Sequence, residues 1–141
     1  MKFNPLNFPQ DVIFIYYFFY LSSPLSGEFK KIMNFEYCKI EIFIPEANFK
    51  ELQNALIEID AGHIGKYDAC LSYSHVIGTW RPLEGSKPYI GEKNKISEEK
   101  ELKVEVTCKT EKIDETIKAI KKVHPYEEPV INVIPLLKVG I

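Results

Sequence analysis

The chain contains an internal repeat of two strand-forming segments, and this repeat constrains the fold more than any other feature of the sequence. Lys-Ile-Glu-Ile at 39–42 returns as Lys-Val-Glu-Val at 103–106, 64 residues later. In each copy apolar residues alternate with charged ones, which is the pattern of a strand with one buried face. Each copy is followed by apolar residues at helical spacing. The sequence therefore predicts two similar strand–helix units, and 141 residues is the length of one domain.

The first unit is expected to begin with a strand over 37–44. Apolar residues at helical spacing then predict a helix over 46–60, with Gly62 as its C-terminal stop. After a short turn, a more polar strand is predicted around 69–80. A connection rich in proline and glycine, over 81–100, leads to the second unit.

The second unit is expected to repeat this order. A strand over 102–108 is followed by a helix with Thr110 as its N-cap, which ends at His124 before a proline. A closing strand is predicted over 130–137. The order strand, helix, strand, strand, helix, strand is that of a ferredoxin-like βαββαβ unit of the α+β class. Its crossovers place both helices on one face of a four-stranded antiparallel sheet.

The first 34 residues differ in composition from the folded domain that we expect at 35–141. Ten apolar and aromatic residues at 12–21 are too few to span a bilayer, which needs about 20. The run has the length of a signal-peptide core, but Lys2 is its only upstream cation and no good cleavage site follows. Three interpretations of 1–34 stay open: a mis-assigned start or appendage with translation from Met33, an ordered N-terminal addition, or a signal or anchor.

The overall charge and the cysteines narrow the class of protein. Eighteen basic and twenty acidic residues give a net charge of -2, and no basic run stands out. We therefore expect no nucleic-acid partner and no membrane partner. The three cysteines, Cys38, Cys70 and Cys108, are odd in number and widely spaced. A disulfide framework is not expected, and a reducing cytoplasm fits best. We expect Cys70 and Cys108 to be buried strand residues.

The stretch over 62–91 gathers residues that usually make loops and sites. It holds five of the seven glycines, the only Trp and the only Arg. Glycine adopts backbone conformations that other residues avoid, so this clustering predicts turns and close backbone approaches. The chain contains no Ser-His-Asp set, no Walker loop and no Gly-x-Gly-x-x-Gly stretch. We therefore expect a protein that is not an enzyme.

Three motifs in this order carry a family resemblance: Gly-His-Ile-Gly-Lys-Tyr-Asp-Ala-Cys at 62–70, the Gly-Thr-Trp-Arg-Pro-Leu-Glu-Gly-Ser-Lys-Pro-Tyr-Ile-Gly stretch at 78–91, and His-Pro-Tyr-Glu-Glu-Pro at 124–129. Over about 35–137 the chain resembles the YqfO or Nif-three-like family. The resemblance is to the domain that larger members carry as a middle insert and that also occurs as a free-standing protein. One residue departs from the pattern: the family usually has glycine where this chain has Val76, two residues before Gly78.

The resemblance carries expectations about fold and assembly. It implies a ferredoxin-like fold related to the CutA and PII proteins, which commonly form trimers. Larger relatives are named for a two-metal centre, whose ligands lie in flanking halves that this chain lacks. A homotrimer is also expected because the helices leave one sheet face and two sheet edges to be covered.

The predicted topology sorts the candidate site residues between the two ends of the sheet. The connection after the second strand and the one after the second helix lie at one end, whereas the turn after the first helix lies at the other. For a small ligand we expect Arg81, Glu84, Gly85, Ser86 and Tyr126. For a divalent metal such as zinc we expect His124, Glu127 and Glu128, with His63 contributing only across a subunit interface.

Each of these assignments has a structural alternative. The prolines around His124 also suit a rigid helix-to-strand link in which the imidazole only ends the helix. Arg81 with nearby glycine amides suits an anion, but an intersubunit salt bridge or a structural loop uses the same residues. Between two glycines, His63 suits a turn better than a ligand role.

Two classes of function follow. The favoured one is an oligomeric binding or regulatory module, without enzyme activity, that takes a small ligand or divalent metal near the 81–100 connection. The second is a metal-dependent, hydrolase-like enzyme, by analogy with the larger Nif-three-like proteins.

Overall fold

The computed structural model describes residues 35–140, and the predictions made for residues 1–34 fall outside this range. A single-turn 3-10 segment precedes each helix, η2 (Glu46–Asn48) and η3 (Thr110–Lys112). The main elements are the strand β1 (Tyr37–Pro45), the helix α3 (Phe49–Glu58), the strands β2 (Leu71–Trp80) and β3 (Ser97–Lys109), the helix α4 (Ile113–Val123) and the strand β4 (Ile131–Leu136).

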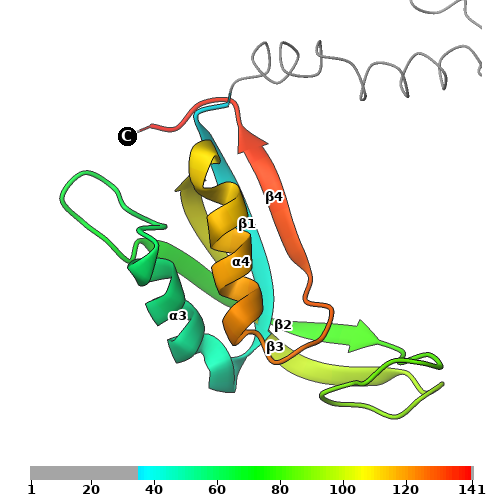
Figure 1. The fold of residues 1–141 in the computed structure, drawn as a ribbon. Coiled ribbons are helices and arrows are strands. Elements are labelled where there is room, and N and C mark those ends of the chain that lie inside the picture. The colour runs from blue at the N-terminus through cyan, green and yellow to red at the C-terminus, as the bar shows by residue number, and fades with distance from the viewer. Residues whose placement is uncertain (1–34, 141) are drawn as a thin grey trace, which may run out of the picture. The chain divides into compact units, whose positions relative to one another are not determined.

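The four strands form one antiparallel sheet in the order β2-β3-β1-β4. Both helices cover the same face of this sheet (Figure 1). The central pair, β1 and β3, comes from the two copies of the repeat, so Ile40 lies opposite Val106 and Ile42 opposite Val104. The predicted α+β, ferredoxin-like βαββαβ fold is confirmed.

The alternating residues of the repeat build the core. The apolar positions of β1 and β3, such as Ile40 and Val104, are buried against Leu52 and Leu56 of α3 and Ile120 of α4. Burying one such side chain stabilises a fold by about 1.5–3 kcal/mol. Apolar residues that recur about every 3.6 residues form a stripe on a helix, and those that recur every second residue form one face of a strand. The stripes of both helices therefore pack against the apolar face of the central strands.

The charged positions of the repeat pair with one another on the uncovered face. The Lys39 Nζ atom lies 2.7 Å from Glu105 Oε1 and 3.0 Å from Glu41 Oε1, which is also 3.0 Å from Lys103 Nζ. Hydrogen bonds from Lys39 and Lys103 lower the pKa of the Glu41 carboxyl to about 2. The centre of this face therefore carries two positive and two negative charges that satisfy each other.

Strand β3 begins earlier than predicted. The sequence predicted a connection up to Lys100, but Ser97 to Lys100 already pair with residues 77–80 of β2. Strand β1 ends where Pro45 meets Glu101, so this part of the sheet has only two strands. In Figure 1 the two strands extend beyond the helices as an arm. The sequence did not indicate this part of β3, because Glu98, Glu99 and Lys100 put charged residues on both of its faces and it has neither a third strand nor a helix against it.

Two local predictions about loops and caps were wrong. Thr110 does not cap α4 with its side chain; it lies in η3, and its N–H donates to the Glu36 carbonyl at 3.0 Å. Cys70 precedes β2, and its N–H donates to the Gly62 carbonyl at 2.9 Å. None of the helices described between residues 35 and 140 has the length and apolar character needed to cross a bilayer.

Candidate functional site

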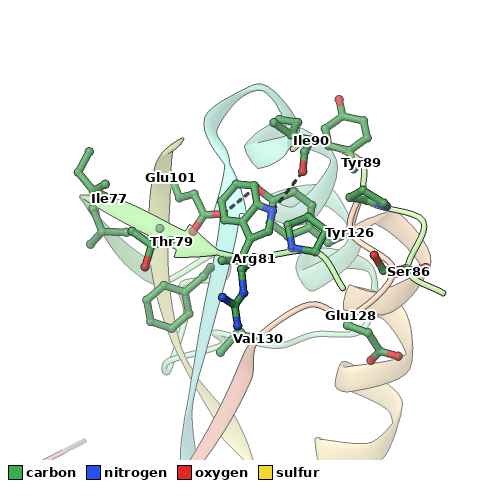
Figure 2. Close-up of a pocket in the computed structure, with 17 residues that line it drawn as sticks. Ile77, Thr79, Arg81, Ser86, Tyr89, Ile90, Glu101, Tyr126, Glu128 and Val130 are labelled. Carbon is green, nitrogen blue, oxygen red and sulfur yellow. Dashed lines mark hydrogen bonds between the residues drawn. The ribbon is translucent and has the colours of Figure 1, made fainter. Parts of the chain in front are cut away.

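A pocket of about 440 Å³ lies at the end of the sheet where the β2–β3 connection meets the α4–β4 connection. Its lining comes from five separate parts of the chain. They are the end of β2 at 76–80, the following loop within 81–90, Glu101 of β3, the segment 126–130, and Phe43 of β1. Figure 2 shows several of these side chains converging from the strands and the two connections.

Aromatic rings form one wall of the pocket. The Tyr126 ring centre lies 5.6 Å from that of Trp80 and 6.1 Å from that of Tyr89. The Trp80 indole N–H donates to the Ile90 carbonyl at 3.1 Å, the contact drawn in Figure 2. This hydrogen bond holds the loop after β2 folded back over the end of its own strand. Buried indole and phenol groups need such polar partners, and here the partners also shape the pocket.

A buried carboxylate lies beside this wall. Glu101 is only 5% exposed, and its Oε1 atom accepts a hydrogen bond from the Tyr126 hydroxyl at 2.7 Å. Burial, with the hydrogen bond to Glu101, raises the pKa of Tyr126, so the phenol stays a donor. A Cβ atom added to Gly78 would lie 2.2 Å from Glu101 Oε2. Gly78 therefore allows the carboxylate to lie directly against β2. Val76, where the chain departs from the family pattern, is the residue of β2 that pairs with Glu101.

His124 lies next to this pocket with both ring nitrogens bound to the main chain. The side chain is 7% exposed; its Nε2 donates to the Phe43 carbonyl at 2.8 Å, and Nδ1 accepts the Tyr126 N–H at 3.1 Å. One neutral tautomer satisfies both bonds. Burial lowers the pKa of His124, which keeps the imidazole neutral. This arrangement corresponds to the structural alternative, in which the imidazole ends the helix.

The structure does not bring His124, Glu127 and Glu128 together as a metal-ligand set. Glu127 Oε1 accepts the N–H of Lys87 at 2.9 Å, which ties the β2–β3 connection to this corner, and Glu128 is exposed at the pocket. Within residues 35–140, no group of three or more His, Cys, Asp or Glu side chains is arranged to hold a metal ion.

His63 lies in the turn after α3, at the end of the sheet where the topology predicted it. Its Nδ1 atom is 2.6 Å from Asp60 Oδ1, and its Nε2 atom is 3.1 Å from the Gly65 carbonyl oxygen. The hydrogen bond to Asp60 raises the pKa of His63. The Asp60 backbone is left-handed, with φ of 60°, and Lys112 Nζ binds its other carboxylate oxygen at 3.1 Å. These contacts close a turn.

The residues expected to bind a small ligand divide into two groups. Arg81, Ser86 and Tyr126 line the pocket. Glu84 does not line it; its carboxylate lies 3.5 Å from Lys93 Nζ on the same connection. Gly85 does not line the pocket either, and its φ of 89° shows that it serves the turn.

Sequence reasoning identified Tyr126 but missed Glu101 and the other two rings of the aromatic wall, Trp80 and Tyr89. Glu101 ends a run of charged residues and falls between the connection predicted over 81–100 and the strand predicted over 102–108. The only signal in the sequence is the alternation of faces along the strand that follows. Counting back from buried Leu102 places Glu101 on the face without helices. Nothing in the sequence indicated that this part of the face is covered by Tyr126.

A four-stranded antiparallel sheet with two helices on one face (Figure 1) defines a domain of the ferredoxin-like fold class, with a pocket at the end of the sheet that carries the β2–β3 connection. A family model described as CutA1 divalent ion tolerance protein matches residues 89–140. A protein named GTP cyclohydrolase 1 type 2 homolog, from Halalkalibacterium halodurans, is 35% identical over 102 residues, which are 72% of this chain and 27% of that protein.

Solved structures show the same relationship. A Bacillus cereus protein related to NIF3 is 32% identical with a TM-score of 0.64, covering 73% of this chain and 26% of that one. The periplasmic divalent cation tolerance protein CutA of Archaeoglobus fulgidus is 21% identical with a TM-score of 0.55, covering 73% and 86%. The resemblance to the Nif-three-like family is confirmed, and the likeness to CutA shows the fold. The chain spans about a quarter of the length of the relatives named GTP cyclohydrolase 1 type 2 homolog.

Proposed function

We propose that this domain is an oligomeric binding or regulatory module without enzyme activity. It binds a small ligand in the pocket between the β2–β3 connection and the α4–β4 connection. The observation that carries the proposal is the pocket itself. It combines apolar and aromatic walls with a few polar groups from separate segments, which is the usual composition of a ligand site. Loops held on a rigid sheet are where binding groups commonly lie.

A pocket-filling substitution tests this proposal. Val130 lines the pocket and is 56% exposed, so Val130→Phe fills space without disturbing the core. Leu83→Phe is the matched control, because Leu83 is 55% exposed on the β2–β3 connection but does not line the pocket. The measurement is a titration of the full chain with nucleotides, small organic cations and anions, and divalent ions, followed by the emission of Trp80, the only tryptophan.

The expected result is that at least one compound changes the Trp80 emission and raises the melting midpoint, since a ligand at 100 times its Kd stabilises the folded state by about 2.7 kcal/mol. Val130→Phe should weaken the binding of that compound at least tenfold, while Leu83→Phe should bind it as tightly as the unchanged chain does. Binding that survives Val130→Phe would put the ligand elsewhere, and a lack of response to every compound at millimolar concentration would contradict the proposal.

The oligomer in this proposal is a homotrimer. The sheet face without helices carries mutually neutralised charges at its centre, and β2 and β4 leave two strand edges. Exposed edges and large uncovered faces are normally covered by a partner. Light scattering at micromolar concentration should give three times the mass of one chain, and a one-chain mass would contradict the trimer.

The second candidate is a metal-dependent, hydrolase-like enzyme. It rests on the name GTP cyclohydrolase 1 type 2 homolog, given to relatives of which this chain spans 27%. Metal analysis and a hydrolysis assay on the purified protein separate the two candidates. Two tightly bound divalent ions per chain, together with turnover of a nucleotide, would favour the enzyme.

A further inference from the structure

Glu101 is a buried acid without a cationic partner among the described residues. Its Oε1 atom has the Tyr126 hydroxyl, but its Oε2 atom accepts no hydrogen bond from residues 35–140. No Lys, Arg or His of this range lies within ion-pair distance of either oxygen. Glu41, on the same sheet face and also buried, has two lysine ammonium groups at 3.0 Å. One oxygen of Glu101 therefore has a single neutral donor, and the other, which is not fully enclosed, has room for a further donor.

The groups around Glu101 favour positive charge. The lining contains three carboxylates, with Glu127 and Glu128 as the other two, against the single cation Arg81. Figure 2 shows the Arg81 side chain extending toward Val130 and away from Tyr126, so it leaves the space beside Glu101 to another group.

The aromatic wall has the same preference. The faces of Trp and Tyr rings carry partial negative charge and attract cations within about 6 Å of the ring centre. Trp80 and Tyr126 both line the pocket, and the Tyr126 hydroxyl is the group that contacts Glu101. A carboxylate beside two aromatic rings is the arrangement that recognises an ammonium or amidinium group.

We propose that the pocket binds a small organic cation, whose N–H groups donate to Glu101 Oε2 and whose flat or apolar part packs on Trp80 and Tyr126. The inference rests on the proposed function and adds to it the chemical class of the ligand. It differs from the anion site that was one of the open interpretations of Arg81. Gly78 has a part in this recognition, because any side chain there would displace the carboxylate from the strand.

Three probes of matched shape test the charge preference. Benzamidinium, benzamide and benzoate are flat rings of nearly the same size with charges of plus one, zero and minus one. Each is titrated into the full chain while Trp80 emission is followed with excitation at the red edge of tryptophan absorption. Benzamidinium is expected to bind at least about tenfold more tightly than benzamide, because a hydrogen bond to a charged group contributes about 1.5–3 kcal/mol. Benzoate should bind most weakly.

Two isosteric variants assign the preference to one carboxylate. Glu101→Gln keeps an oxygen for the Tyr126 hydroxyl and removes the charge, so benzamidinium should lose its advantage over benzamide. Glu99→Gln is the control, because Glu99 is on the same strand, exposed, and absent from the pocket lining. It should keep the preference of the unchanged chain. If Glu101→Gln does not fold, the order of the three probes on the unchanged chain decides the question.

The outcomes separate this inference from the proposed function. Tighter binding of benzoate than of benzamidinium would overturn the cation site while leaving a ligand-binding module. A preference for benzamidinium that persists in Glu101→Gln would also overturn the assignment. If no probe binds the unchanged chain at a concentration of about 10 mM, where only very weak binding would be detected, the cation inference fails. The wider ligand panel with Val130→Phe then decides the proposed function by itself.

Discussion

The two helix-to-strand connections occupy equivalent places in the internal repeat, but they hold their histidines in opposite ways. In the connection from α3 to β2, Asp60 and Gly62 have left-handed backbones, and His63 is exposed beside them. In the connection from α4 to β4, no residue over 124–130 has a positive φ, and His124 is buried. The first turn is made by backbone conformation, whereas the second is made by a side chain that binds the main chain twice.

This difference shows that the role of a histidine in a turn depends on its partners rather than on its neighbours in sequence. His63 pairs with the carboxylate of Asp60, three residues before it. His124 instead satisfies the carbonyl of Phe43, 81 residues before it. An exposed ion pair contributes little to stability, but a buried polar group that loses its partner destabilises the fold by its full desolvation penalty.

The largest expected effect follows from His124→Ala. This change leaves the Phe43 carbonyl and the Tyr126 N–H without their partner and removes a buried ring. We expect a loss of about 3–5 kcal/mol in the free energy of unfolding, measured by urea denaturation. His63→Ala, the matched change at the other connection, should alter that free energy little. Equal losses from the two substitutions would remove the contrast between the connections.

The next largest effect concerns the glycines of the first connection. A Cβ atom on Gly62 would lie 2.7 Å from the Cys70 carbonyl oxygen, and the Gly62 φ is 77°. Gly62→Ala should therefore destabilise by about 2–4 kcal/mol, from backbone strain plus a clash with main chain. Gly65→Ala is the control: its φ is 62°, but nothing lies within 4 Å of the added atom. It should show only the strain, about 1–2 kcal/mol. Similar losses at both glycines would mean that the close approach contributes nothing.

The smallest expected effect is a difference in pH dependence. Burial lowers the pKa of His124 below 6.5, so its stabilising contribution is present above pH 6.5 and is lost as the pH falls below it. The hydrogen bond to Asp60 raises the pKa of His63, so that contribution is present below pH 6.5 and is lost as the pH rises through the raised value. For His124 one proton changes the free energy of unfolding by at most about 1.4 kcal/mol per pH unit.

Two glutamine variants measure these opposite slopes. Between pH 8 and pH 5, His124→Gln should lose less free energy of unfolding than the unchanged chain, because it lacks the group that takes up a proton on unfolding. His63→Gln should lose more, because it lacks the group that is protonated more readily in the folded state. Urea denaturation at four pH values gives both slopes. Parallel curves for the three proteins would contradict the assigned directions.

The sequence determined the fold because its strongest signals are local. The alternation in 39–42 and 103–106 specifies two central strands, and the helical stripes specify what covers them. From these elements the topology alone placed Arg81 and Ser86 at the same end of the sheet as Tyr126, where they now line one pocket.

What the sequence could not indicate depends on contacts between distant segments. Glu101 is buried where Tyr126, 25 residues later, donates its hydroxyl to it and where Gly78 of the neighbouring strand leaves room for it. From the sequence His124 suited either a metal or a structural corner, and its bonds to the main chain of Phe43 and Tyr126 depend on contacts that the sequence does not show. Ser97 to Lys100 form a strand because residues 77–80 are beside them, and their own charged pattern carries no sign of it.

The two-stranded arm has a consequence for how this protein changes over evolutionary time. Strand β1 makes its last pair with β3 at Pro45 and Glu101, so the register of the four-stranded sheet is complete before the arm begins. Insertions and deletions in the loop at 81–96 therefore leave the pairing of the central strands intact. That loop also supplies much of the pocket wall. Selection can alter what the pocket admits while the residues that determine folding stay as they are.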